Sequence, residues 1–169
     1  MASTDNKPVM VMGLYDSKHS FYALEWTLER YFANFGPNCP FKLVIVLARP
    51  TPASVVGVGG PGSGAFMTII ESEFKRKATR AVDEIKEICR KKSVEDVKVE
   101  IVEGNPRKVI CDAVDRHHAS ILVVGSHGYG AVKRAVLGSV SDYCAHHAHC
   151  SVTIVKRPSK TSIDMSYFR

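Results

Sequence analysis

Apolar residues along this chain alternate between two kinds of spacing. Five short segments have the length and apolar content of β-strands: 8–15, 41–49, 97–102, 120–125 and 151–156. Between them, apolar residues recur every three or four positions, which is the spacing of an amphipathic helix. One such stripe runs from Phe21 to Phe35 and is stopped by Gly36 and Pro37, and a longer one runs from Phe66 to Ile88. The pattern therefore predicts strands and helices in alternation.

This alternation favours the α/β class, because neighbouring parallel strands need a crossover between them and a helix usually supplies it. The segment 120–125 is almost continuous in Ile, Leu and Val, as expected for a strand covered on both faces. We predict a doubly wound, Rossmann-like parallel sheet of five strands in three α/β/α layers. In such folds ligands bind at the carboxyl ends of the strands, where the strand order reverses.

The domain organisation follows from length and composition. A chain of 169 residues with 45% hydrophobic content is long enough for one domain with a buried core. We expect this domain to span 8–157, with a flexible loop at 50–65 that is rich in Pro and Gly. The first residues, 1–7, and the basic tail, 158–169, have no clear period and are expected to be disordered.

Charge and cysteine content restrict the partners and the location. The net charge is +6, but the basic clusters at 75–77 and 90–92 are mixed with acidic residues and lack interleaved aromatics, which argues against a nucleic-acid partner. No apolar run is long enough to cross a membrane. Five cysteines at irregular spacing favour a reducing compartment, so we expect a cytoplasmic protein, with the nucleus as a second location.

Two glycine-rich segments could bind phosphate. The first, "GVGGPG" at 57–62, contains a literal G-x-G-x-x-G, but several residues separate it from the preceding strand. The dinucleotide fingerprint requires its first glycine directly after a strand and its last at a helix start. Loop composition therefore explains this segment, and neither segment has the Gly-Lys-Ser/Thr ending of a P-loop.

The second segment, "GSHGYGAVKRAVLGS", directly follows the strand at 120–125. Gly125 and Gly128 allow close approach of the backbone, and Gly138 precedes a renewed helical pattern. Backbone N–H groups of the loop and of the helix start would both favour an anion. Ser139 and Ser141 add hydroxyl groups there, although either could simply cap the helix. The spacing indicates a phosphate site.

The spacing G-x2-G-x9-G-[S/T], filled here by Gly125, Gly128, Gly138 and Ser139, resembles the ATP-binding signature of the universal stress protein family. The likeness extends to "DSKHSFYALEW" and to the stretch from "GNPRKV" to "SVTIVK", which is similar to plant members. This resemblance implies a strand order of 3-2-1-4-5. That order would place the ends of the first and fourth strands side by side.

The resemblance also implies roles for individual residues. Asp16 would hold the ribose or a phosphate-bound Mg²⁺ or Mn²⁺, and Ala48 would present its backbone to adenine. Leu14 and Tyr15 would line and narrow the adenine pocket, since many members carry smaller residues there. The complete expected nucleotide-binding set is Leu14, Tyr15, Asp16, Ala48, Val124, Gly125, His127, Gly128, Gly138, Ser139, Val140 and Ser141.

A cluster of cysteines and histidines, "CAHHAHC" at 144–150, suggests a zinc site at first sight. On a helix, however, His146 and His147 point about 100° apart, and Cys144 shares a face only with His147. The segment alone therefore cannot supply four tetrahedral ligands, and we predict no structural metal there.

Three function classes are compatible with these residues. The first is a regulatory or protective stress protein whose binding of ATP, ADP or AMP alters its surface or its dimer. The second is a slow ATPase, for which only Asp16 and His127 could act as a base. The third is a chaperone or interaction protein for which nucleotide is incidental. We favour the first, with weak or no turnover and with signalling partners that the sequence does not identify.

The strand at 151–156 is the last of the sheet and is expected at an edge, where unpaired backbone groups can bind another chain. Members of the family commonly pair through this strand. The resemblance therefore implies a homodimer.

Overall fold

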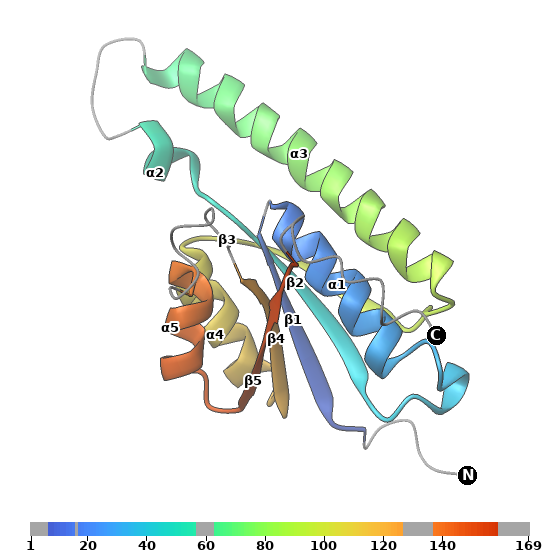
Figure 1. Cartoon of the computed structure of the whole chain (residues 1–169). Helices are drawn as coiled ribbons and strands as arrows, with labels where there is room; N and C mark the ends of the chain where they lie inside the picture. The colour runs from blue at the N-terminus through green and yellow to red at the C-terminus, as the bar shows by residue number, and fades with distance from the viewer. Residues whose placement is uncertain (1–6, 16, 57–62, 127–136, 159–169) are drawn as a thin grey trace.

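The computed structural model describes residues 7–15, 17–56, 63–126 and 137–158 of the chain. A parallel sheet forms its centre, with the strand order β3-β2-β1-β4-β5 (Figure 1). This order confirms the predicted α/β class and topology. The strands are β1 (Val9–Tyr15), β2 (Lys42–Arg49), β3 (Val97–Glu103), β4 (Ile121–Ser126) and β5 (Ser151–Lys156).

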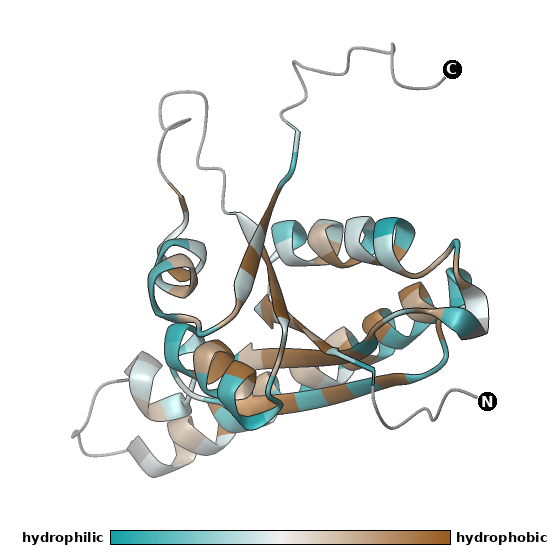
Figure 2. Ribbon diagram, turned by 90° about the horizontal axis from the view of Figure 1, so that it is seen from below, coloured by the Kyte–Doolittle hydropathy of each residue, from teal (hydrophilic) through white to brown (hydrophobic). Residues whose placement is uncertain are grey.

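Helices cover both faces of the sheet and give the three expected layers. On one face lie α1 (Lys18–Tyr31) and the long α3 (Ser63–Lys91), and on the other lie α4 (Pro106–Arg116) and α5 (Ser139–His147) (Figure 1). A short helix, α2 (Pro52–Val56), packs against α3. The inner strands are apolar along most of their length, whereas the helices mix polar and apolar residues (Figure 2).

The alternation of side chains along β2 divides the core into two halves. Leu43, Ile45 and Leu47 are buried among residues of α1 and α3, while the intervening Val44 and Val46 are buried among residues of α4. A strand buried on both faces reads as a continuous apolar run, which explains why β2 and β4 lack the alternation seen in β3. In this second half of the core, Ile110 of α4 packs closely against Gly13 of β1.

The first helix ends earlier than its apolar stripe predicts. We expected it to continue to Phe35, but α1 ends at Tyr31 and the chain then turns into the 3₁₀ helix η2 (Gly36–Asn38). Phe32 is still buried in the core from the turn, whereas Phe35 is 46% exposed. The apolar spacing therefore extends beyond the end of α1, because the turn that follows the helix also places Phe32 in the core.

Two parts of the segment 50–65, which was expected to be a loop, are helical. Helix α2 begins at Pro52, where a missing N–H costs little, and α3 begins at Ser63, before the apolar stripe starts. These helices correct the expectation of a loop over 52–56 and 63–65. The glycine-rich motif at 57–62 lies outside the described residues. The same is true of 1–6 and 159–169, the bulk of the two terminal segments.

The start of α4 agrees with its sequence pattern. Asn105 is the N-cap, and its side-chain oxygen accepts a hydrogen bond from the backbone N–H of Arg107 at 3.0 Å. Pro106 occupies the first helical position, which is the position where proline is best tolerated.

Candidate functional site

The carboxyl ends of β1, β2 and β4 meet where the strand order reverses. Tyr15 at the end of β1 lies in register with Ala48 on β2, and Gly13 lies in register with Val124 on β4. The N-terminal end of α5 lies at this same end of the sheet (Figure 1). The fold therefore brings together the strand ends that form the ligand crevice in open α/β sheets.

The predicted adenine-side residues are mostly core residues. Leu14 is 1% exposed, Ala48 is 4% exposed and Val124 is fully buried. Their side chains are packed against helices, so a ligand at the rim of the sheet could use chiefly their backbone groups. Of the predicted residues that the structure describes at this end of β1 and β2, Tyr15 alone has a partly exposed side chain.

The Tyr15 side chain reaches from β1 to the end of β4. Its hydroxyl donates a hydrogen bond to the carbonyl oxygen of Gly125 at 3.4 Å. Its ring packs on the same side of the sheet as Ala48, among residues that face α4 and α5. The phenol therefore bridges two strand ends at the reversal point.

Gly125 has a structural reason to be glycine. A Cβ atom at this position would lie 2.7 Å from the backbone carbonyl oxygen of His19, in the first turn of α1. No side chain fits into that space without moving backbone. This glycine therefore lets the first turn of α1 approach the end of β4.

The start of α5 is not capped by a side chain of the described residues. Its N-cap is Gly138, which has no side chain to accept a hydrogen bond from the helix. The carbonyl oxygen of Gly138 accepts hydrogen bonds from the N–H of Asp142 and from the hydroxyl of Ser141, both at 2.9 Å. The first N–H groups of a helix have no partner within the helix, and its dipole places partial positive charge there. A helix start of this kind is able to bind an anion.

The three residues that begin α5 differ in the groups that they could offer to an anion. Ser141 is fully buried and its hydroxyl is directed to Gly138, so it can offer its backbone N–H to an anion. Val140 is 7% exposed. Ser139 is exposed, and its hydroxyl can turn toward an anion.

Three predicted site residues lie outside the described residues: Asp16, His127 and Gly128. Asp16 falls between Tyr15 and Ser17, and the other two follow Ser126 directly. Their roles stay predictions.

A serine pair that sequence reasoning missed holds the junction on either side of Asp16. Ser17 is the N-cap of α1, and its hydroxyl oxygen accepts the N–H of Ser20 at 3.2 Å. Ser20 is fully buried, and its hydroxyl oxygen accepts the N–H of Tyr15 at 3.3 Å. The spacing Ser-x-x-Ser after a strand was the available clue, since it is typical of a capped helix start.

The histidines and cysteines of 144–150 have other partners. His146 and His147 each place Nδ1 against a backbone carbonyl one turn back, at 2.8 Å and 2.9 Å, and His147 stacks on Tyr143. Within the described part of the chain, no three His, Cys, Asp or Glu side chains gather as metal ligands. All five cysteines are free thiols, and burial raises the pKa of Cys144 to about 12.

These features define a Rossmann-like α/β domain in which helix α5 begins at the end of the sheet where the strand order reverses. The chain belongs to the universal stress protein family, whose model matches residues 8–156. No helix in the described residues has the length and apolar character needed to span a membrane.

Similar proteins include plant and bacterial members of the family. The universal stress protein PHOS34 of Arabidopsis thaliana is 43% identical over 164 residues, which cover 84% of this chain and 59% of PHOS34. The chain spans between 31% and 62% of the length of the first curated relatives it matches.

Two solved structures share the fold. The universal stress protein UspA of Lactobacillus plantarum matches with a TM-score of 0.69 at 18% identity, covering 88% of this chain and 97% of its own. A universal stress protein family member from Arabidopsis thaliana, solved with AMP bound, matches with a TM-score of 0.62 at 24% identity, covering 94% and 99%.

Proposed function

We propose that this protein is an adenine-nucleotide-binding stress protein whose occupancy by ATP, ADP or AMP regulates its surface or its assembly. The observation that carries the proposal is the uncapped start of α5 at the reversal point of the sheet. The AMP bound to the Arabidopsis relative supports the choice of adenine nucleotides. We place this protein in the cytoplasm or the nucleus.

The phosphates occupy the start of α5. The N–H groups of Ser139, Val140 and Ser141 donate to phosphate oxygens, and the exposed hydroxyl of Ser139 adds a further donor. A Mg²⁺ or Mn²⁺ ion that accompanies the nucleotide would neutralise part of the phosphate charge, with Asp16 as its contact. Gly128 and His127 wrap the ribose and phosphates.

The adenine ring lies at the ends of β1 and β2. Ala48 offers backbone groups to the base, because its side chain is buried. Leu14 and Tyr15 close the pocket from β1, and Val124 and Gly125 close it from β4. The Tyr15 ring already bridges β1 and β4, so it must pack against the base or move aside when the base enters.

Binding without rapid hydrolysis is the expected behaviour. Asp16 and His127 are the only candidate bases among the proposed site residues, and we propose that they hold the nucleotide rather than activate water. Nucleotide binding then alters the assembly of the protein. We propose that this assembly is a homodimer that pairs through β5 (Ser151–Lys156), an edge of the sheet.

A chaperone or interaction role is the second candidate function. It is favoured by the N-terminal half of α3, where Phe66 is 55% exposed and Ile69 is 60% exposed. Exposed apolar groups of this size are typical of surfaces that bind other proteins.

Calorimetric titration of the full chain with ATP, ADP and AMP in the presence of Mg²⁺ tests the proposal. The decisive variant is Gly138→Asp. A carboxylate at the N-cap accepts hydrogen bonds from the helix N–H groups itself and repels phosphate, so binding should be lost. Because Gly138 is buried, circular dichroism and thermal melting must first show that the variant folds. Gly64→Asp is the matched control, because it adds the same charge in open space on α3.

Wild-type binding that is lost in Gly138→Asp and kept in Gly64→Asp supports the phosphate site. Unchanged binding by Gly138→Asp rules out the start of α5 as that site. If wild type binds none of the three nucleotides, the nucleotide-dependent function is wrong and the interaction role becomes the better candidate.

A further inference from the structure

Strand β3 forms the second edge of the sheet, with β2 as its only neighbour in the strand order of the described residues. An edge strand leaves one row of backbone N–H and C=O groups available to another chain. Val97, Val99 and Ile101 face α3, whereas Lys98 and Glu100 lie on the α4 side. Ile101 is 45% exposed, so the apolar side of this edge is incompletely covered.

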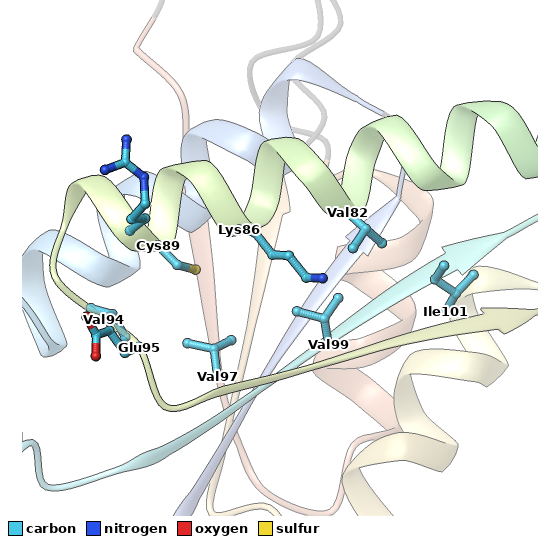
Figure 3. Close-up of a pocket in the computed structure, with 9 residues that line it drawn as sticks. Val82, Lys86, Cys89, Val94, Glu95, Val97, Val99 and Ile101 are labelled. Atoms are coloured by element: carbon cyan, nitrogen blue, oxygen red, sulfur yellow. The ribbon is translucent and has the colours of Figure 1, made fainter.

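A groove of about 550 Å³ runs between β3 and the C-terminal half of α3 (Figure 3). Val97, Val99 and Ile101 line it from the strand, and Val82 and Lys86 line it from the helix. The groove thus adjoins the strand edge, and any chain that pairs with β3 would also cover this apolar surface.

The sequence of β3 is complementary to itself. In an antiparallel pair centred on Val99, Lys98 lies opposite Glu100 of the second copy, and Val97 lies opposite Ile101 of the second copy. Opposite charges facing each other across two strands are stabilising, and so are apolar pairs. Each favourable pair occurs twice, because a two-fold axis relates the copies.

Other registers lack this match. Moving the centre to Lys98 or to Glu100 keeps the faces aligned but places two lysines or two glutamates directly opposite each other. Like charges in that position are destabilising. A shift of the pairing by a single residue brings apolar side chains opposite charged ones. The charges therefore select the register centred on Val99.

Lys98 and Glu100 carry the charges that this contact requires. Lys98 is 57% exposed and lies 2.7 Å from Glu100 of its own chain. Burial opposes ionisation of Glu100, but hydrogen bonds from Lys98, His117 and Arg116 outweigh it and lower its pKa to about 2. Glu100 is therefore a fixed negative charge at neutral pH, and Lys98 is an exposed cation that can reach across the edge.

Two unfavourable pairs in this register lie at the end of the strand. Asp96 would face Val102 of the second copy, and Glu103 would face Glu95, which carries the same charge. Arg49 forms an ion pair with Glu103 within the chain and offsets its charge. The favourable pairing is thus concentrated over 97–101.

We propose that β3 is a self-association surface, where the β3 strands of two copies pair antiparallel about Val99 and extend the sheet across both molecules. The two grooves then adjoin each other on one face of the joined sheet. Since β5 is the opposite edge, this contact is independent of a dimer through β5 and would allow assemblies larger than a dimer.

A charge-swap experiment with the full chain tests the contact. Sedimentation equilibrium is measured for wild type, Lys98→Glu, Glu100→Lys and an equimolar mixture of the two variants. Each variant alone replaces two opposite-charge pairs by two like-charge pairs, and we expect its association through β3 to weaken by about tenfold. In the mixture, a Lys98→Glu chain can pair with a Glu100→Lys chain. Both cross-strand pairs then join opposite charges again, so association should return.

Lys42→Glu is the matched control, because it makes the same charge change on an exposed side chain of an interior strand. Glu100→Lys loses its contacts with α4, so circular dichroism and thermal melting must first show that it folds. Association of Lys98→Glu equal to that of the control overturns the proposal. So does a mixture of two folded variants that fails to associate more strongly than either alone.

Hydrogen exchange of wild type at increasing protein concentration provides a second measurement that needs no variant. Protection of the backbone amides of 97–101 should rise with concentration. Protection that rises only over Ser151–Lys156 would show that β5 alone mediates association and would overturn the β3 contact.

Discussion

The phenolic oxygen of Tyr15 lies 3.4 Å from the carbonyl oxygen of Gly125, so a side chain at the end of β1 is held to the end of β4. These strands are neighbours at the reversal point, where a ligand would enter. A base placed between β1 and β2 must therefore share this space with the phenol ring.

Tyr15→Phe removes the hydroxyl that donates to Gly125 but keeps the ring, so it tests the effect of the hydrogen bond without changing the bulk of the side chain. If the ring must leave Gly125 before adenine enters, the wild type loses a hydrogen bond worth about 0.5–1 kcal/mol on binding. We expect the variant to bind ATP about threefold more tightly, measured by calorimetry, and to unfold at a slightly lower urea concentration. Equal affinities for the two proteins would show that the contact places no restraint on the pocket.

Gly125→Ala tests the approach of α1 to β4. Its Cβ would lie 2.7 Å from the His19 carbonyl oxygen, and backbone cannot yield as a flexible side chain can. We expect a loss of about 1–3 kcal/mol in the free energy of unfolding, measured by urea denaturation, together with weaker nucleotide binding.

Gly64→Ala is the control for that substitution. Its added Cβ meets no atom within 4 Å, and the position is the second residue of helix α3. Alanine should therefore leave the stability unchanged or raise it slightly, by less than the roughly 0.5–1 kcal/mol found in helix interiors. A Gly125→Ala variant as stable as wild type would contradict the packing explanation.

Much of the fold could be predicted from the sequence, because each strand and helix carries its own apolar period. The boundaries were less certain. Phe32 lies in the core although it belongs to a turn, so in the apolar pattern it looked like a further helical residue of α1. The α2 helix has only five residues, too few to show a period against a background of proline and glycine.

The candidate site was predictable only in part. The glycine spacing located the start of α5, and the strand order implied by the family resemblance placed the end of β1 beside the end of β4. The contact between Tyr15 and Gly125 joins residues 110 positions apart, and the close approach of His19 to Gly125 is also non-local. Such contacts depend on how helices pack onto the sheet, and no local pattern encodes them.

Ser17→Ala should destabilise α1 at the junction that contains Asp16. The substitution removes the side-chain oxygen that accepts the Ser20 N–H, and lost N-caps cost about 1 kcal/mol. Ser17→Asp retains an acceptor and places negative charge at the helix start, so its stability should stay near that of wild type. Urea denaturation measures both. If alanine and aspartate variants are equally stable, the cap contributes little.

The stability of the protein should fall in acid partly through Glu100. Burial alone would raise the pKa of this carboxyl, but hydrogen bonds from Lys98, His117 and Arg116 outweigh burial and lower the pKa from 4.5 to about 2 in the folded state. A depressed carboxylate pKa stabilises the fold fully above the unfolded-state pKa, and this contribution is lost as the pH falls toward the folded-state value.

The Glu100 contribution should therefore decline between about pH 5 and pH 2, by an amount on the order of 2 kcal/mol. Glu100→Gln cannot titrate, so its unfolding free energy should depend less on pH across this window than that of wild type. Urea denaturation at a series of pH values measures the difference. Glu87→Gln is a suitable control, because Glu87 is an exposed partner of Arg90 on α3 and its screened ion pair contributes little. Parallel pH profiles for wild type and Glu100→Gln would mean that the charges around Glu100 are equally favourable in the unfolded chain.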